Sequence, residues 1–81
     1  MLEIENDSSQ AIELYWVDYK GVEVEYKKIA PNTTYTQQTY FSHVWHFRDQ
    51  QGNLILEYVA TRADSQKIVF AANNTISTPT P

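Results

Sequence analysis

The sequence predicts an all-β fold, an antiparallel β-sandwich of about seven short strands. Three observations lead to this prediction. Short segments alternate apolar and polar residues with a period of two, turn-forming residues separate them at intervals of about ten residues, and no segment longer than a turn has helical periodicity. The 81 residues, 42% of them hydrophobic, suffice for one small domain. We expect the sandwich to span residues 1–74 and the Ser/Thr/Pro-rich residues 75–81 to form a tail or linker.

An opening strand and a β-hairpin are expected in the first third of the chain. The segment 2–5 is a short strand, and the segment 11–19 alternates regularly, with one face carrying Ile12, Leu14 and Trp16. Lys20 and Gly21 supply a turn. The segment 22–29 then alternates again, and the residues expected to face inward are Val22, Val24 and Tyr26.

Two further strands are expected in the middle of the chain. Ala30-Pro31-Asn32 breaks the pattern, and the segment 33–39, rich in Thr, Gln and Tyr, is expected to be a partly exposed strand. The next strand spans residues 43–48. Period-two alternation places on one of its faces His43, Trp45 and Phe47, and on the other Val44, His46 and Arg48.

The last strands follow a turn over residues 49–53. Alternation resumes with Leu54, Leu56 and Tyr58 set against Ile55, Glu57 and Val59. A final strand is expected over residues 66–72, around Ile68 and Phe70.

Composition excludes several classes of site. The chain has no cysteine, which excludes disulfides and thiolate zinc sites, and its two histidines lack a metal-site spacing, so we expect no metal and no cofactor. The net charge of -4 comes without a basic stripe, so no nucleic-acid partner is expected. No apolar run approaches the ~20 residues of a membrane span, and no targeting signal is visible in the piece given. We therefore expect a soluble piece without a membrane partner, and its compartment stays open.

Binding chemistry is concentrated in the segment 39–49, which combines aromatic and imidazole rings with a threonine hydroxyl and an arginine. If the chain bends near Ser42, Thr39 and His43 line one wall beside Trp45. A hydroxyl, an imidazole and an indole then converge on one spot. Such a pocket suits a small ring that bears one hydroxyl.

The order of these residues resembles the β domain of the von Hippel-Lindau tumour suppressor family. The resemblance covers nearly the whole chain. It rests on Asn-x-Ser-Ser near the start, a strand with a tryptophan, a glycine turn, a tyrosine before a proline-containing loop, and Thr-Tyr-x-x-His-x-Trp-x-Phe-Arg-Asp at residues 39–49. The resemblance implies a seven-stranded sandwich that captures an extended peptide of hypoxia-inducible factor through one trans-4-hydroxyproline.

The resemblance also implies the site residues. The positions that match the hydroxyproline pocket are Trp16, Tyr26, Thr39, His43 and Trp45, and Tyr40 matches a neighbouring tyrosine. Thr39 stands where the family has a serine. The three large aromatic residues of this set would enclose the pyrrolidine ring, and the threonine and histidine would satisfy its hydroxyl.

Two positions depart from the family pattern, because Gln38 stands where the family has a histidine and Tyr35 where it has an arginine. Contacts that flank the hydroxyproline are therefore expected to differ. The elongin-binding helical domain of the family has no counterpart in this piece, so no elongin-type partner is expected from it.

We interpret the chain as a non-catalytic peptide-recognition module, and two alternatives stay open: a carbohydrate-binding domain and a structural accessory β-sandwich. A flat ladder of exposed aromatic rings would favour sugar, whereas a closed pocket with Thr39 opposite His43 would favour hydroxyproline. Catalysis is not expected, since no Gly-x-Ser-x-Gly elbow or other nucleophile setting is present. On composition alone Trp16 is a core residue. His46 and Arg48 are expected to be exposed or paired with an acidic neighbour such as Asp49, without a function.

Overall fold

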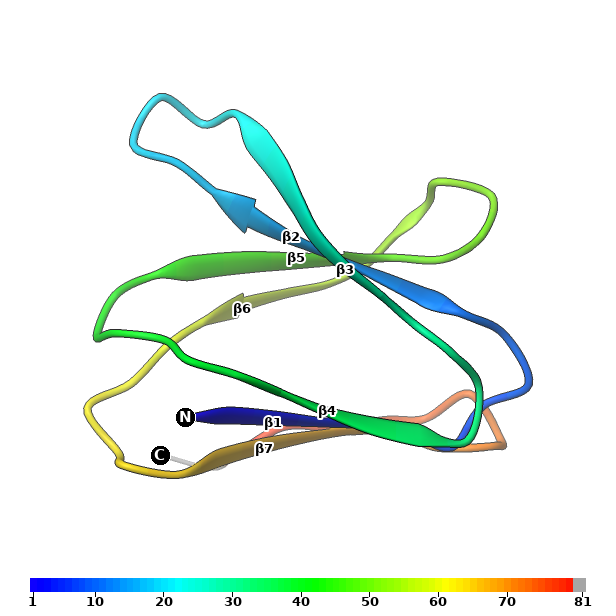
Figure 1. The fold of residues 1–81 in the computed structure, drawn as a ribbon. Coiled ribbons are helices and arrows are strands. Elements are labelled where there is room, and N and C mark those ends of the chain that lie inside the picture. The colour runs from blue at the N-terminus through cyan, green and yellow to red at the C-terminus, as the bar shows by residue number, and fades with distance from the viewer. Residues whose placement is uncertain (80–81) are drawn as a thin grey trace.

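Eight strands in two sheets form the fold of residues 1–79, the part of the chain that this computed structural model describes. No helix occurs among these residues. The strands are β1 (Leu2–Asn6), β2 (Ile12–Val17), β3 (Glu23–Ile29), β4 (Thr33–Gln37), β5 (Val44–Arg48), β6 (Leu54–Val59), β7 (Gln66–Phe70) and β8 (Ile76–Ser77). One sheet has the order β4-β1-β7-β8 and the other β3-β2-β5-β6, and the two lie as facing layers (Figure 1). The predicted β-sandwich is confirmed.

The first sheet is built around β1, which pairs on both sides. It runs antiparallel to β4, with Ile4 opposite Tyr35, and parallel to β7, with Ile4 opposite Ile68. This sheet is therefore mixed rather than purely antiparallel. β8 adds a short edge through the pairing of Ile76 with Phe70. Ile76 and Ser77 were expected in the tail, but they form the eighth strand. The division of the chain after residue 74 stays a prediction.

The second sheet contains the predicted hairpin, β2 and β3, which pair antiparallel. Gly21 has a φ of 81°, a conformation that glycine adopts without strain, and the Asp18 carboxylate accepts hydrogen bonds from the main-chain N–H groups of Lys20 and Val22. β5 pairs with β2, which sets Trp16 opposite Trp45. The hairpin and the start of β5 therefore meet at one end of the sheet.

The core lies between the two sheets and consists of apolar side chains that are almost fully buried: Leu2, Ile4, Ile12, Leu14, Ile29, Trp45, Phe47, Tyr58, Ala60, Ile68 and Phe70. Phe47 of one sheet contacts Phe70 of the other, with ring centroids 5.2 Å apart. Burying a large apolar side chain stabilises the folded state by roughly 1.5–3 kcal/mol. These contacts hold the sheets together. Trp45 and Phe47 of β5 both face the core, as their alternation predicts.

The inward face predicted for β3 is wrong. Val22, Val24 and Tyr26 are 55%, 40% and 47% exposed, respectively. β3 is an edge strand, and the tip of its hairpin with β2 bends away from the opposite sheet (Figure 1). No layer covers this part of the strand, so its alternating pattern does not produce burial.

Two buried polar side chains organise the loops. Asn6 donates from Nδ2 to the carbonyl oxygens of Gln10, Ile29 and Ala30, and its Oδ1 accepts from Ser8. Gln66 is 3% exposed and ties down the loop between β6 and β7. Both side chains satisfy main-chain groups that the sheets leave unpaired.

Candidate functional site

The candidate residues come from four segments that meet at one end of the second sheet. β2 and β3 supply one residue each, the loop between β4 and β5 supplies three, and β5 supplies one: Trp16, Tyr26, Thr39, Tyr40, His43 and Trp45. The register of the strands causes this convergence, since Trp16 lies opposite Trp45 and opposite Val24, two residues before Tyr26. The structure brings all six side chains into one group.

Four of the side chains form a continuous series of ring contacts. The ring centroids of Tyr40 and His43 are 5.4 Å apart, and those of His43 and Trp16 are 5.8 Å apart. Trp16 and Tyr26 follow at 6.4 Å. Three of these residues are aromatic and one is an imidazole, so the surface offers apolar ring faces beside one polar ring.

Trp45 and Thr39 complete the group beneath this surface. The Trp45 ring meets Tyr26 edge-on, with centroids 5.2 Å apart, and only 1% of the residue is exposed. Its Nε1 donates a 2.8 Å hydrogen bond to Thr39 Oγ1. A hydroxyl carries one donor hydrogen and two acceptor lone pairs. Thr39 therefore keeps its own hydrogen and one lone pair for another partner.

The bend expected near Ser42 is present and places His43. Ser42 has a φ of 71°, and the main-chain N–H of His43 donates to the carbonyl of Tyr40. Ser42 and His43 also exchange main-chain hydrogen bonds with Ala60, which anchors the loop to the end of β6. His43 thus directly precedes β5, on the same side as Trp45.

A comparison with known protein families matches residues 3–72 to the VHL beta domain. The chain belongs to the VHL β-domain family. This family consists of protein-interaction domains that recognise substrates and are not themselves enzymes. A search of curated proteins found no match.

Side chains next to the group differ from the VHL pattern in the two ways that the sequence indicates. Gln38 donates from Nε2 to the hydroxyl of Tyr40, 2.9 Å away. The Tyr35 hydroxyl donates to Gln37 Oε1, and the ammonium of Lys27 lies 5.5 Å from the centre of the Tyr35 ring. Both side chains are thus engaged within the domain itself, and Gln38 contacts Tyr40, an exposed tyrosine of the group.

The opposite face of the second sheet holds an ionic network. His46 lies between two carboxylates, with Nδ1 2.6 Å from Glu23 Oε2 and Nε2 2.7 Å from Glu57 Oε2, and Arg48 pairs with Glu23 at 2.8 Å. The expected pairing with acidic residues is present, but Asp49 is not a partner: its carboxylate instead accepts from Gln51 and Asn53 in the turn after β5. The register of β3, β2, β5 and β6 creates the network, and no local pattern identifies its partners.

This network shifts two pKa values. Hydrogen bonds from Arg48 and His46 lower the pKa of Glu23 to about 2. Burial lowers the pKa of His46, but hydrogen bonds and charge interactions with Glu23 and Glu57 outweigh burial, so the pKa of His46 is raised overall. The network therefore favours an ionised Glu23 and a protonated His46.

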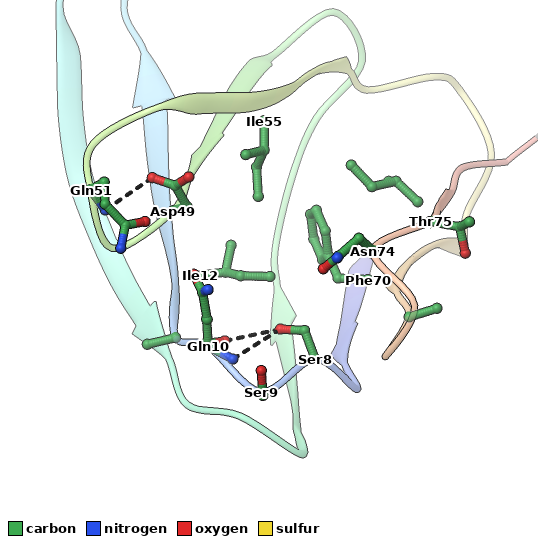
Figure 2. Close-up of a pocket in the computed structure, with 13 residues that line it drawn as sticks. Ser8, Ser9, Gln10, Ile12, Asp49, Gln51, Ile55, Phe70, Asn74 and Thr75 are labelled. Carbon is green, nitrogen blue, oxygen red and sulfur yellow. Dashed lines mark hydrogen bonds between the residues drawn. The ribbon is translucent and has the colours of Figure 1, made fainter.

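Two cavities occur on the surface of the described residues. One, of about 290 Å³, lies at the opposite end of the sandwich, between the loop after β1, the turn after β5 and the turn before β8, with Ile12 and Phe70 among its apolar lining (Figure 2). It contains none of the six candidate residues. The second, of about 300 Å³, includes Thr39 and Tyr40. Trp16, Tyr26, His43 and Trp45 line neither cavity. The first three belong to the surface of rings, and Trp45 is buried beneath it.

The described residues show neither a metal site nor a membrane-spanning helix. Among residues 1–79, no group of three His, Asp or Glu side chains is placed to hold a metal ion. The same residues include no helix long and apolar enough to cross a membrane.

Proposed function

We propose that this VHL β domain is a non-catalytic module that binds an extended peptide through a hydroxyproline. The ligand's pyrrolidine ring packs among Trp16, Tyr26 and Tyr40. Trp45, which the sequence analysis expected to enclose this ring, is only 1% exposed and acts instead through its hydrogen bond to Thr39. Its hydroxyl bonds to Thr39 and His43. No cofactor, metal or elongin-type partner takes part in this function.

The observation that carries the proposal is the hydrogen bond from Trp45 to Thr39 within the group of rings. A buried indole fixes the threonine oxygen while leaving its hydrogen and one lone pair free. The imidazole of His43 reaches the same group through its contacts with Tyr40 and Trp16. A ligand hydroxyl can donate to one of these polar groups and accept from the other, and the rings supply apolar contacts around it.

Discrimination against unmodified proline follows from the same chemistry. A proline would leave both polar groups covered and without a partner. An unsatisfied group in a closed contact costs about 1–3 kcal/mol, so two such groups would weaken binding by about a hundredfold or more.

The peptide backbone has an available edge beside this site. β4 is the outermost strand of the first sheet, and its Thr34 and Thr36 are exposed. An extended peptide that pairs with an edge strand gains main-chain hydrogen bonds, while its side chains enter pockets that select sequence. The loop after β4 leads directly to Thr39, so one peptide can contact both.

Carbohydrate binding is less well supported by the ring geometry. Sugar platforms need exposed rings in one plane, but Tyr19 meets Trp16 at 88° and Tyr26 meets Trp16 at 59°. Steeply inclined rings surround a small ligand better than they stack under a flat one. The rings of this domain therefore favour a small saturated ring over a sugar.

The decisive experiment is a calorimetric titration with matched peptides that differ only in proline versus trans-4-hydroxyproline. Tighter binding of the hydroxylated peptide, by about a hundredfold, is expected. Equal affinity for the two peptides would refute hydroxyproline recognition and leave general peptide binding. Binding of neither peptide would make the domain a structural accessory unit or return sugar recognition to first place.

A further inference from the structure

The second cavity shares a wall with the candidate site. Thr39, Tyr40 and Phe41 line one side of this space of about 300 Å³, and residues 61–64 of the loop between β6 and β7 line the other. Thr39 and Tyr40 also belong to the group proposed to hold hydroxyproline. A peptide seated on that group therefore passes next to this cavity.

The cavity wall carries a guanidinium held by an aromatic ring. The guanidinium carbon of Arg62 lies 3.9 Å from the centroid of the Phe41 ring, within the range of a cation–π contact. Phe41 is itself 52% exposed, so the contact lies at the surface. The ring limits the positions of the arginine side chain, which reduces the entropy that the arginine loses when it binds a ligand.

The side chain of Gln66 holds the loop that carries Arg62. Gln66 is buried and accepts a hydrogen bond from the main-chain N–H of Thr61, while its amide donates to the carbonyl of Ala63. These two bonds hold the residues on either side of Arg62. The guanidinium is thus presented by a rigid segment.

Among residues 1–79, no carboxylate pairs with this guanidinium. Of the two arginines, Arg48 is paired with Glu23, but Arg62 has no ion-pair partner within 4.0 Å among residues 1–79. Asp64 is the one acidic residue among those that line the cavity, and it makes no ion pair with Arg62. An arginine fork in a cavity matches the two oxygens of a carboxylate, which it can bind with parallel hydrogen bonds.

We propose that Arg62 and this cavity form a subsite for an aspartate or glutamate side chain of the same peptide that places its hydroxyproline on the candidate site. The inference rests on the proposed function and specifies its ligand further. An extended peptide advances about 3.3 Å per residue, and the two sites share Thr39 and Tyr40. The acidic residue therefore lies within about three positions of the hydroxyproline.

A charge scan of the peptide tests this subsite. Each position from about four before to four after the hydroxyproline carries aspartate or asparagine in turn, and calorimetry gives the two affinities. At one position within about three of the hydroxyproline, aspartate should bind about three to ten times more tightly than asparagine. Salt should reduce this preference, because an open cavity does not shield an ion pair.

Variants of the domain test whether Arg62 causes the preference for aspartate over asparagine. Arg62→Gln should abolish the preference for aspartate and leave the preference for hydroxyproline over proline intact. Arg62→Lys should retain part of it, since it keeps the charge but loses the fork. Lys28→Gln is the matched control, because it removes one exposed positive charge from β3, and it should leave the preference unchanged.

The outcomes separate this subsite from the hydroxyproline site. A hydroxyproline preference without any preference for aspartate, or an aspartate preference that survives Arg62→Gln, would overturn the subsite alone. If the hydroxyproline preference itself is absent, the proposed function fails. In that case the same charge scan on proline peptides tests the Arg62 subsite by itself. A preference for aspartate that Arg62→Gln removes would support the subsite, and the lack of any preference for aspartate would refute it.

Discussion

The indole of Trp45 donates a 2.8 Å hydrogen bond to the hydroxyl of Thr39, six residues earlier in the chain. One partner is buried in the core and the other lies at the surface of the candidate site, so the bond connects the packing of the sandwich to the chemistry of binding. Without this bond the threonine hydroxyl could rotate or point its oxygen elsewhere.

Removing the indole donor should weaken both peptide binding and the fold. Trp45→Phe keeps a large ring in the core but loses Nε1, and the affinity for a hydroxyproline peptide should fall by about three- to tenfold, the value of one hydrogen bond. The smaller ring should lower the free energy of unfolding by about 1–2 kcal/mol. Calorimetry and denaturant unfolding measure the two effects.

Thr39 offers a matched pair of substitutions. Thr39→Ser keeps the hydroxyl, so the preference for hydroxyproline should persist. Thr39→Val keeps the shape but loses the hydroxyl, so the preference should fall by about tenfold or more. An unchanged preference in Thr39→Val would show that the hydroxyl of Thr39 does not contact the ligand.

His43 should be essential for the same interaction. His43→Ala is expected to abolish measurable binding of the hydroxyproline peptide while leaving the fold intact, since the residue is only partly buried and precedes β5. Far-ultraviolet circular dichroism checks the fold, and the same titration checks binding. Unchanged affinity in this variant would contradict the proposed site.

Much of the fold could be predicted because its signals are local. The alternation in β2 and β5 identifies the inward residues Ile12, Leu14, Trp45 and Phe47 correctly, since a period of two converts directly into one buried face. The same alternation fails in β3, because whether a face is covered depends on the other sheet. Val24 and Tyr26 alternate with charged residues but meet solvent.

The sequence could predict which residues lie together in the candidate site, but not the contacts between them. The spacing of Thr39, His43 and Trp45 within one segment indicates convergence, and the family resemblance adds Trp16, Tyr26 and Tyr40. The bond between Trp45 and Thr39, and the position of Arg62 over Phe41, depend on how loops pack together. Contacts of this kind depend on the conformation of loops and leave no periodic signal in the sequence.

The pairing of Glu23 with His46 should give stability a maximum in weakly acidic solution. The folded-state pKa of Glu23 is about 2, below its ordinary value of 4.5, so its contribution is present above about pH 4.5 and is lost as the pH falls toward 2. The folded-state pKa of His46 is raised above 6.5. Its contribution is therefore complete below about pH 6.5 and is lost as the pH rises through the folded-state value.

Denaturant unfolding across the pH range checks this maximum, expected between about pH 4.5 and 6.5. His46→Gln should remove the alkaline decline that His46 causes, whereas Glu23 still pairs with Arg48 and should retain the acid decline. His43→Gln serves as the control histidine and should keep the alkaline decline. If His46→Gln declines as steeply above pH 6.5 as the unmodified chain, the ionic network does not cause it.

Asn6 should be among the most sensitive positions for stability. Its side-chain amide is fully buried and donates to three main-chain carbonyls, which joins the loop after β1 to the end of β3. Asn6→Asp preserves the shape but places carboxylate oxygen against those carbonyls, so the free energy of unfolding should fall by about 3 kcal/mol or more. Asn73→Ala, at an exposed turn, should cost less than about 1 kcal/mol. Equal losses in the two variants, measured by denaturant unfolding, would show that Asn6 does not anchor these loops.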